Sequence, residues 1–198
     1  MPDEPDDHHD ATLGLARETV ELVPHDPAWA DAYDAEVERL QSELDTTGLG
    51  FEHVGSTAIP GIAAKPIVDM LLLVSDLDDT DELANELDAA GYEERPDDVP
   101  DRRFFARGPP SNRTHYLSVT ERGSDCHREQ VAFRDALRAD PELAAEYDSL
   151  KHELADASPD DRAAYTDAKS SFVRSVLEDA DERRSSVRQT RSGDTEDR

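Results

Sequence analysis

Apolar residues recur at steps of three and four along several segments of the chain. Trp29, Tyr33, Val37, Leu40 and Leu44 form one such stripe, and this spacing places side chains on one face of a helix. The same pattern predicts five helices, over residues 28–45, 78–90, 125–138, 141–156 and 159–180.

A capping residue followed by proline opens three of these segments, at Asp26-Pro27, Asp140-Pro141 and Ser158-Pro159. A side-chain oxygen at the N-cap accepts a hydrogen bond from the first turn, and proline fits the first helical position because the N–H it lacks would have no partner there. These dipeptides therefore predict three helix starts independently of the apolar pattern.

The strongest strand signal is the segment PIVDMLLLV, residues 66–74, which is apolar at nearly every position. Such a run is typical of a strand covered on both faces, and we expect it to be the central strand of the fold. Further strands are predicted over residues 50–54, near Tyr92, and over 102–106 and 114–120. The order of the elements predicts an α/β or α+β domain with a helical C-terminal portion.

The two ends of the chain lack this periodicity. Residues 1–17 are mostly acid, His and Pro, and residues 182–198 contain one Val among polar residues. Few apolar residues with many charges are typical of disorder. We therefore predict a disordered acidic arm over 1–17, one domain over 18–181 and a disordered polar tail over 182–198.

The composition is strongly acidic, with 48 Asp and Glu against 21 Lys and Arg and a formal net charge of −27. Binding to nucleic acid or to an anionic membrane depends on a basic face, so neither partner is expected. Only three of the cations are lysines, Lys65, Lys151 and Lys169. Together these features favour a salt-adapted protein of haloarchaeal type, because the Debye length shrinks to roughly 3 Å in molar salt. A mesophilic acidic protein is the alternative.

The scarcity of cysteine and of long apolar segments indicates the cellular compartment. Cys126 is the single cysteine, which excludes an intramolecular disulfide and a multi-cysteine zinc site. No apolar run reaches the roughly 18 residues of a membrane span, and the acidic start does not resemble a secretory signal. We expect a cytoplasmic protein without a membrane partner, and the sequence leaves its oligomeric state open.

One carboxylate, Asp69, interrupts the apolar run PIVDMLLLV. A charge on a buried strand is costly unless it is paired, hydrogen-bonded, bound to a metal or placed at a cleft. The preceding strand ends in Gly55-Ser56, whose backbone N–H groups and hydroxyl suit a phosphate, and Lys65 offers it a point charge. A buried Asp satisfied by backbone groups or by an Arg is the alternative.

Gly55-Ser56 followed by Asp69 on the next apolar strand resembles the nucleotidyltransferase superfamily. Two longer motifs, HVGSTAIPGIAAKPIVDM and AFRDALRADPELAAEYDSLKHELA, look like the GrpB family over about residues 20–180. The resemblance implies a nucleotidyltransferase-like fold with a mixed β-sheet flanked by helices. It also implies a link to dephospho-CoA kinase, because a related domain is fused to that enzyme in some bacteria as an accessory domain.

Nucleotidyltransferases of this kind hold Mg²⁺ with two carboxylates in a [DE]-h-[DE]-h pattern, against the nucleotide phosphates. By the resemblance, Asp69 is the first carboxylate and the metal ligand, but Leu71 stands at the second position. Glu52 and Asp76 are candidates for its replacement. The resemblance also brings His115 to the site, as the part that remains of a His-x-His pattern.

An arginine-rich stretch interrupts the acidic composition. Residues 101–138 contain eight Arg and five acidic residues, a local excess of positive charge that favours an anionic ligand. Arg102 and Arg103 begin a predicted strand, and we expect them to be solvated.

Arg134 and Arg138 lie four residues apart on one face of a predicted helix. This spacing suits a clamp for a phosphate or a carboxylate. In the alternative, the two side chains form structural salt bridges with their acidic neighbours Asp135, Asp140 and Glu142.

The sequence thus predicts a nucleotidyltransferase-fold protein that binds a nucleotide or another phosphorylated small molecule together with Mg²⁺, and that transfers a nucleotidyl group if it is catalytic. Asp69 is the predicted catalytic residue and metal ligand. The predicted phosphate or nucleotide contacts are Gly55, Ser56, Lys65, His115, Arg134 and Arg138. The alternatives are a non-catalytic accessory module that has lost the second carboxylate, and a buried ion-pair network beneath a protein-interaction surface.

Salt adaptation predicts a higher melting temperature in molar KCl than in dilute buffer, because salt screens the repulsion between acidic side chains. Thermal unfolding followed by circular dichroism measures the difference, with a neutral osmolyte as the control that does not screen charge. Equal melting temperatures in the two buffers would contradict the hypothesis.

Overall fold

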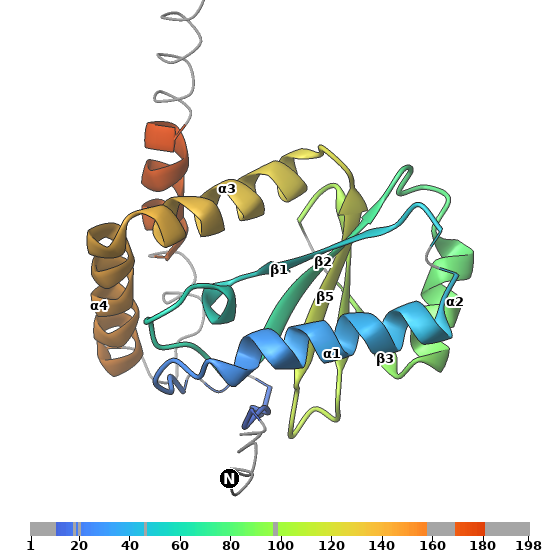
Figure 1. Ribbon diagram of the computed structural model, residues 1–198, viewed down its shortest axis with the longest axis horizontal. Coiled ribbons are helices and arrows are strands. Elements are labelled where there is room, and N and C mark those ends of the chain that lie inside the picture. Colours follow the sequence, from blue (N-terminus) through green and yellow to red (C-terminus); the bar gives the residue numbers. More distant parts are fainter. Residues whose placement is uncertain are drawn as a thin grey trace, which may run out of the picture.

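A five-stranded sheet with helices on both faces forms the body of the molecule (Figure 1). The computed structural model describes residues 11–17, 19, 21–45, 47–96, 99–157 and 169–180. The strands are β1 (Gly50–Val54), β2 (Val68–Val74), β3 (Tyr92–Arg95), β4 (Arg102–Arg107) and β5 (His115–Glu121). The helices are α1 (Ala28–Glu43), α2 (Asp81–Ala89), α3 (Asp125–Ala139) and α4 (Pro141–Ala157), with a 3₁₀ turn η1 (Ser56–Ala58) and a further helix over residues 169–180.

The predicted fold class, α/β (α+β) with a helical C-terminal portion, is confirmed. The helix starts at two proline dipeptides have the expected cause: Asp140 Oδ1 accepts hydrogen bonds from the N–H groups of Glu142 and Leu143 at 3.1 and 3.2 Å. Asp26 Oδ1 accepts one from the N–H of Ala28 at 3.0 Å. The third dipeptide, Ser158-Pro159, and the first half of its predicted helix lie outside the described residues.

The strands are ordered β1-β2-β5-β4-β3, with β2 parallel to β5 and the other neighbours antiparallel. The middle strand is therefore β5, and the prediction that residues 66–74 form the central strand is wrong. The apolar run indicates that helices cover both faces of the strand. It does not indicate which place in the order of strands this strand takes. All residues of β2 are buried except Asp69, which is partly exposed.

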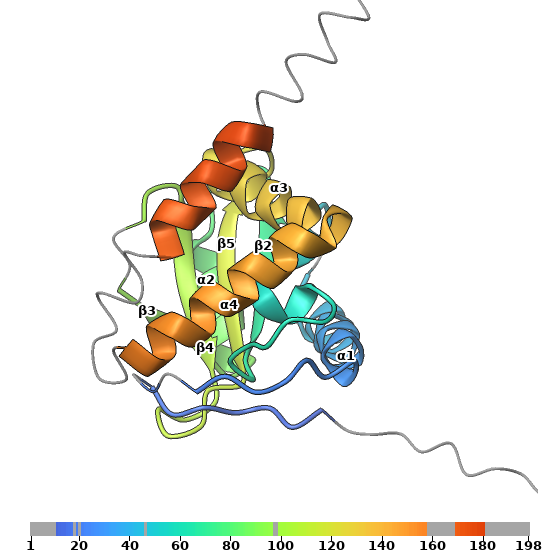
Figure 2. The same cartoon turned by 90° about the vertical axis from the view of Figure 1, so that its left-hand side faces the viewer.

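Each face of the sheet has its own apolar core. Side chains such as Val68, Met70 and Leu72 pack with α1 and α2 on one face. On the other face Leu71 and its neighbours pack against α3. A third cluster joins the segment after β1 to α3, α4 and the helix 169–180; its buried members are Ile59, Ile62, Leu137, Ala144, Tyr147 and Val176. Figure 2 shows α4 and the helix 169–180 in front of the sheet on this second face.

The predicted arm over residues 1–17 is wrong for residues 11–17, which lie against the body. Leu15 is buried and forms an antiparallel bridge with Arg113. The N–H of Gly14 donates to the carbonyl of Pro66 at 2.8 Å. Leu15 supplies the apolar anchor of this segment, and the backbone groups find partners in two loops. Residues 1–10 and 181–198 lie outside the described part.

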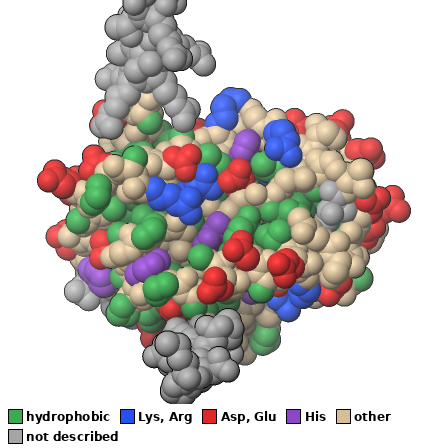
Figure 3. All heavy atoms as spheres, in the orientation of Figure 1, with side chains coloured by type: hydrophobic (Ala, Val, Ile, Leu, Met, Phe, Trp, Pro, Cys, Tyr) green, Lys and Arg blue, Asp and Glu red, His purple; other side chains and the backbone are tan. Residues whose placement is uncertain are grey.

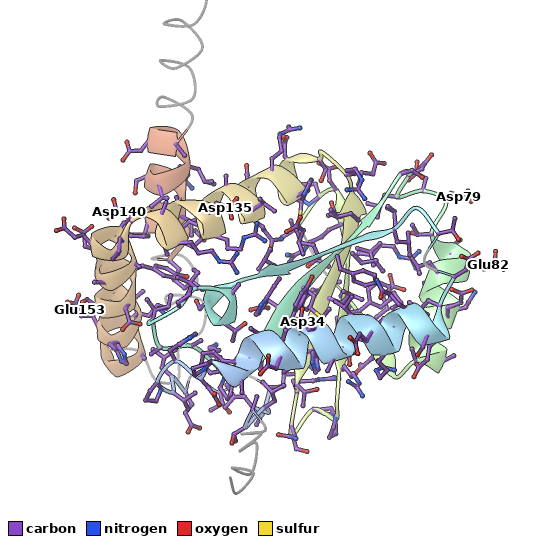
Figure 4. All side chains as sticks on the ribbon, viewed as in Figure 1. Asp34, Asp79, Glu82, Asp135, Asp140 and Glu153 are labelled. Carbon is purple, nitrogen blue, oxygen red and sulfur yellow. The ribbon has the colours of Figure 1, made fainter. Side chains whose placement is uncertain are left out.

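Acidic side chains cover the outside of the molecule. Asp79, Glu82, Asp140 and Glu153 project away from the ribbon on different elements (Figure 4), and acidic groups line the margin of the face drawn in Figure 3. None of the described helices has the length and apolar character needed to cross a membrane.

Candidate functional site

A cleft of about 650 Å³ opens on the second face of the sheet, beside Asp69. Its floor comes from β2, β4 and β5, and its walls come from Leu22, η1, the segment before β2, α3, α4 and the helix 169–180. The residues that line it are Leu22, Ser56, Thr57, Ala64, Lys65, Asp69, Arg102, Phe104, Tyr116, Glu129, Lys151, Lys169, Ser170, Val173, Arg174 and Leu177.

The charge of this cleft is opposite to that of the molecule. Among the described residues that line it, the cations are Lys65, Arg102, Lys151, Lys169 and Arg174, and the acids are Asp69 and Glu129. The sequence has three lysines, and all three are in this set. A positive cleft in a chain of net charge −27 attracts small anions through the local potential of its walls.

Asp69 reaches the cleft because β1 and β2 pair as antiparallel neighbours with Val54 opposite Asp69. The chain then turns at Gly55, whose φ is +71°, and a Cβ built there would lie 2.5 Å from Asp69 Oδ2. Only glycine accepts both the positive φ and this close approach. The predicted Gly55-Ser56 and Asp69 are thus brought together, with Ser56 on the cleft wall.

Burial raises the pKa of the Asp69 carboxyl to about 6, and the positive charges of Lys169, Lys65 and Arg102 oppose this shift. Desolvation is the larger effect because the carboxylate lies low in the cleft among apolar strand residues. Asp69 is therefore ionised at neutral pH at a cost to the folded state.

A clamp from α4 fixes the segment that carries Lys65. Asp148 Oδ1 accepts a hydrogen bond from the N–H of Ala63 at 2.8 Å, and Lys151 Nζ donates to the carbonyl of the same residue. Lys151 is 1 % exposed and pairs with Asp148 at 3.2 Å; burial lowers the pKa of its ammonium group to about 8. Since both backbone groups of Ala63 are held, Lys65, two residues on, has a fixed place in the cleft wall.

Two aromatic rings form part of the cleft floor. Phe104 of β4 and Tyr116 of β5 lie with ring centroids 5.3 Å apart, and the guanidinium of Arg102 lies 5.2 Å from the Phe104 ring centroid. Aromatic faces of this kind pack against planar apolar groups.

His115 is not brought to the cleft. Asp69 pairs with Tyr116 in the β2–β5 register, so its neighbour His115 points to the opposite face of the sheet, toward α1. There burial lowers the pKa of the His115 imidazole to about 4, against the opposing charge of Glu36. The His-x-His resemblance therefore indicated the correct strand, β5, but His115 lies on the face of the sheet opposite the cleft.

Arg134 and Arg138 also lie outside the set that lines the cleft. Arg134 pairs with Glu52 at 2.7 Å and with Asp135 at 2.8 Å, and donates to the carbonyl of His53 on the edge strand β1 at 2.9 Å. Arg138 donates to the carbonyl of Ala58 at 2.7 Å. These contacts agree with the alternative of structural pairing.

Most of the arginine-rich stretch forms ion pairs of this structural kind. Arg107 binds the buried Glu36, and Arg113 binds Glu93. The expectation that Arg102 and Arg103 are solvated is wrong: Arg102 lines the cleft, and Arg103 pairs with acids on β3 and α2. Alternation along β4 sends these two neighbours to opposite faces.

The donor set of the cleft does not fit a resident Mg²⁺. Leu71, at the second carboxylate position, is fully buried. Glu52 is held by Arg134, and Asp76 accepts from the N–H of Asp78 beyond the other end of β2. Glu129, the second acid of the lining, is exposed on α3. Over the described residues, no three His, Cys, Asp or Glu side chains gather into a metal site.

The fold and cleft define an α+β protein with a cation-lined site on a mixed sheet. The family model described as GrpB protein matches residues 19–179, so this chain belongs to the GrpB family. The crystal structure of the conserved protein GrpB from Enterococcus faecalis is 33 % identical with a TM-score of 0.73, covering 81 % of this chain and 96 % of that one.

Two relatives are longer than this chain. UPF0157 protein PA4798 from Pseudomonas aeruginosa is 41 % identical over 164 residues, covering 80 % of this chain and 66 % of the relative. Dephospho-CoA kinase from Mycolicibacterium paratuberculosis is 34 % identical over 192 residues, covering 84 % of this chain and 47 % of the kinase. The relatives named here are bacterial, and salt adaptation stays a prediction.

Sequence reasoning missed the side chains that close the cleft from the C-terminal half: Lys151, Lys169 and Arg174. They lie more than 80 residues after Lys65 in the sequence; Lys151 stands within the second GrpB-like motif, which assigns it no role, and Lys169 and Arg174 lie after that motif. The scarcity of lysine could have indicated them in part, because a chain with three lysines makes each one a candidate for a binding site.

Replacing Gly55 by alanine is predicted to destabilise the fold more than replacing Gly61. Both residues have a positive φ, at +71° and +85°, but a Cβ at Gly61 meets nothing within 4 Å. Gly61→Ala should cost about 1 kcal/mol for the backbone alone, and Gly55→Ala about 1–3 kcal/mol more for the clash with Asp69. Denaturant unfolding measures both, and equal costs would show that the close approach is unimportant.

Asp69→Asn is predicted to stabilise the folded protein at pH 7–8 by about 3 kcal/mol, since the pKa of Asp69 is raised from 3.8 to about 6 and each unit of pKa shift corresponds to about 1.4 kcal/mol. The raised pKa means that the folded state binds more protons than the unfolded state between about pH 4 and 6, so wild-type stability falls as the pH rises through this range. The gain should therefore fade on acidification. Unfolding at several pH values tests this, with the exposed Asp76→Asn as the control.

Proposed function

We propose that this chain binds a phosphorylated small molecule of nucleotide type in the cleft beside Asp69. The observation that carries the proposal is the convergence of all three lysines of an acidic chain, with Arg102 and Arg174, on one cleft. Lysine is a point charge for phosphate, and arginine adds directed N–H donors.

The cleft offers different surfaces to the two parts of such a ligand. Lys65, Lys169 and the hydroxyl of Ser56 provide charge and a hydrogen-bond donor for phosphate oxygens. Phe104 and Tyr116, whose ring planes meet at 48°, provide aromatic faces for a base or another planar group. A volume of about 650 Å³ is within the range of small-molecule sites.

A second candidate function is a non-catalytic accessory module that binds the same class of ligand. Leu71 supports it, because the buried apolar side chain occupies the position from which a second carboxylate would hold metal for nucleotidyl transfer. A dephospho-CoA kinase matches this chain over about half of its own length, as expected if such a module also occurs beside a separate catalytic domain. Release of pyrophosphate or phosphate from a bound nucleotide distinguishes transfer from binding alone.

The proposal predicts that pyrophosphate, ADP or ATP binds to the wild type, and that Lys65→Gln and Lys169→Gln each weaken binding about tenfold, the value of one charge-assisted hydrogen bond. Isothermal titration calorimetry measures the affinities. Arg128→Gln is the matched control, because it removes one positive charge from an exposed pair with Asp125 away from the cleft. The proposal fails if none of the three ligands binds to the wild type.

A further inference from the structure

We infer that the cleft takes its phosphate ligand as a free polyanion, without a divalent cation, and that the ionised Asp69 side chain acts as an internal counter-ion that the ligand must compete with. This inference rests on the proposed function and concerns its binding mode. It assigns to Asp69 a role opposite to that of a metal ligand, because a metal ligand would strengthen phosphate binding.

The first observation is the balance of charge around Asp69. The charged and titratable groups that share its cleft are Lys65, Arg102, Tyr116, Glu129, Lys151, Lys169 and Arg174. The charges that act most strongly on the Asp69 carboxyl are those of Lys169, Lys65 and Arg102. Three positive side chains thus act on the carboxylate that a metal ion would have to bind.

The second observation is the set of oxygen ligands. A cation shared between protein and phosphate needs carboxylates on the protein side, because Mg²⁺ is held by carboxylates together with substrate phosphates. The residue two positions after Asp69 is the fully buried Leu71, and Glu52 is committed to Arg134. Glu129, the other acid in the lining, is exposed on α3. Without a shared metal, the charges of Asp69 and of a bound phosphate face each other directly and repel.

These two observations explain why an acid occupies a cleft built for an anion. In the empty cleft, Asp69 neutralises part of the repulsion among the surrounding cations, and Gly55 leaves room for its carboxylate at the strand end. A polyphosphate then takes over the same cations and carries more negative charge than Asp69 does. The Asp69 carboxylate then loses its favourable interaction with these cations. Its repulsion of the bound phosphate lowers the affinity of the cleft for the ligand.

The test is pyrophosphate binding measured by calorimetry at pH 8, at the lowest KCl concentration that keeps the protein folded, with EDTA or with excess Mg²⁺. We compare wild type with Asp69→Asn, and use Asp76→Asn as the matched control that changes the net charge equally at an exposed site outside the cleft. In EDTA, Asp69→Asn should bind roughly 5- to 10-fold more tightly than wild type, and Asp76→Asn should match wild type.

A second measurement needs no variant. Mg²⁺ should weaken pyrophosphate binding to the wild type, because the metal complex of pyrophosphate carries less negative charge into the cleft. Stronger binding with Mg²⁺, or weaker or unchanged binding by Asp69→Asn, would overturn the inference while the proposed ligand class survives. Absence of pyrophosphate and nucleotide binding to every variant under both conditions would overturn the proposed function itself.

Discussion

The alternation of side chains along β2, fixed by its pairing with β1 and β5, is the constraint on which the rest of the structure depends. It turns Val68, Met70 and Leu72 toward α1 and α2, and turns Asp69 and Leu71 toward α3 and the cleft. The same register selects Tyr116, and not His115, as the neighbour of Asp69. A slip of one residue would exchange the two faces, which would bury the Asp69 carboxylate in the main core and remove it from the cleft.

Most of the described arginines have a different task from the lysines, although Arg102 and Arg174 share the cleft with them. The arginines form ion pairs and hydrogen bonds within the fold. Arg107 and Arg39 pair with the buried Glu36, and Arg134 donates a hydrogen bond to the carbonyl of His53 on the edge strand β1. The forked guanidinium suits these fixed, multiple contacts, whereas the ammonium group is a compact charge on a flexible stem. Lysine is reserved for the cleft, apart from the added task of Lys151 in holding Ala63.

The elements of the fold could be predicted from the sequence because they depend on local patterns. The bounds of β1 and the start of α4 at Pro141 follow from apolar spacing and capping, and the close approach of Gly55 to Asp69 follows from the pairing of two adjacent strands. The walls of the cleft depend on contacts between distant segments. Arg102 and Lys151 reach it through the lateral order of β4 and the packing of α4, and neither is encoded in a local pattern. His115 illustrates the same limit, since a motif names a strand without fixing which residue faces the ligand.

The confinement of lysine to one cleft also has a chemical consequence. Reagents that modify primary amines ordinarily label a protein surface at many positions, but here the lysine amines all belong to one small region. Lys151 is almost fully enclosed, whereas Lys65 and Lys169 are only partly buried. Apart from the chain's own amino terminus, an amine-directed probe is therefore a probe of the cleft, and the native protein needs no engineered attachment point there.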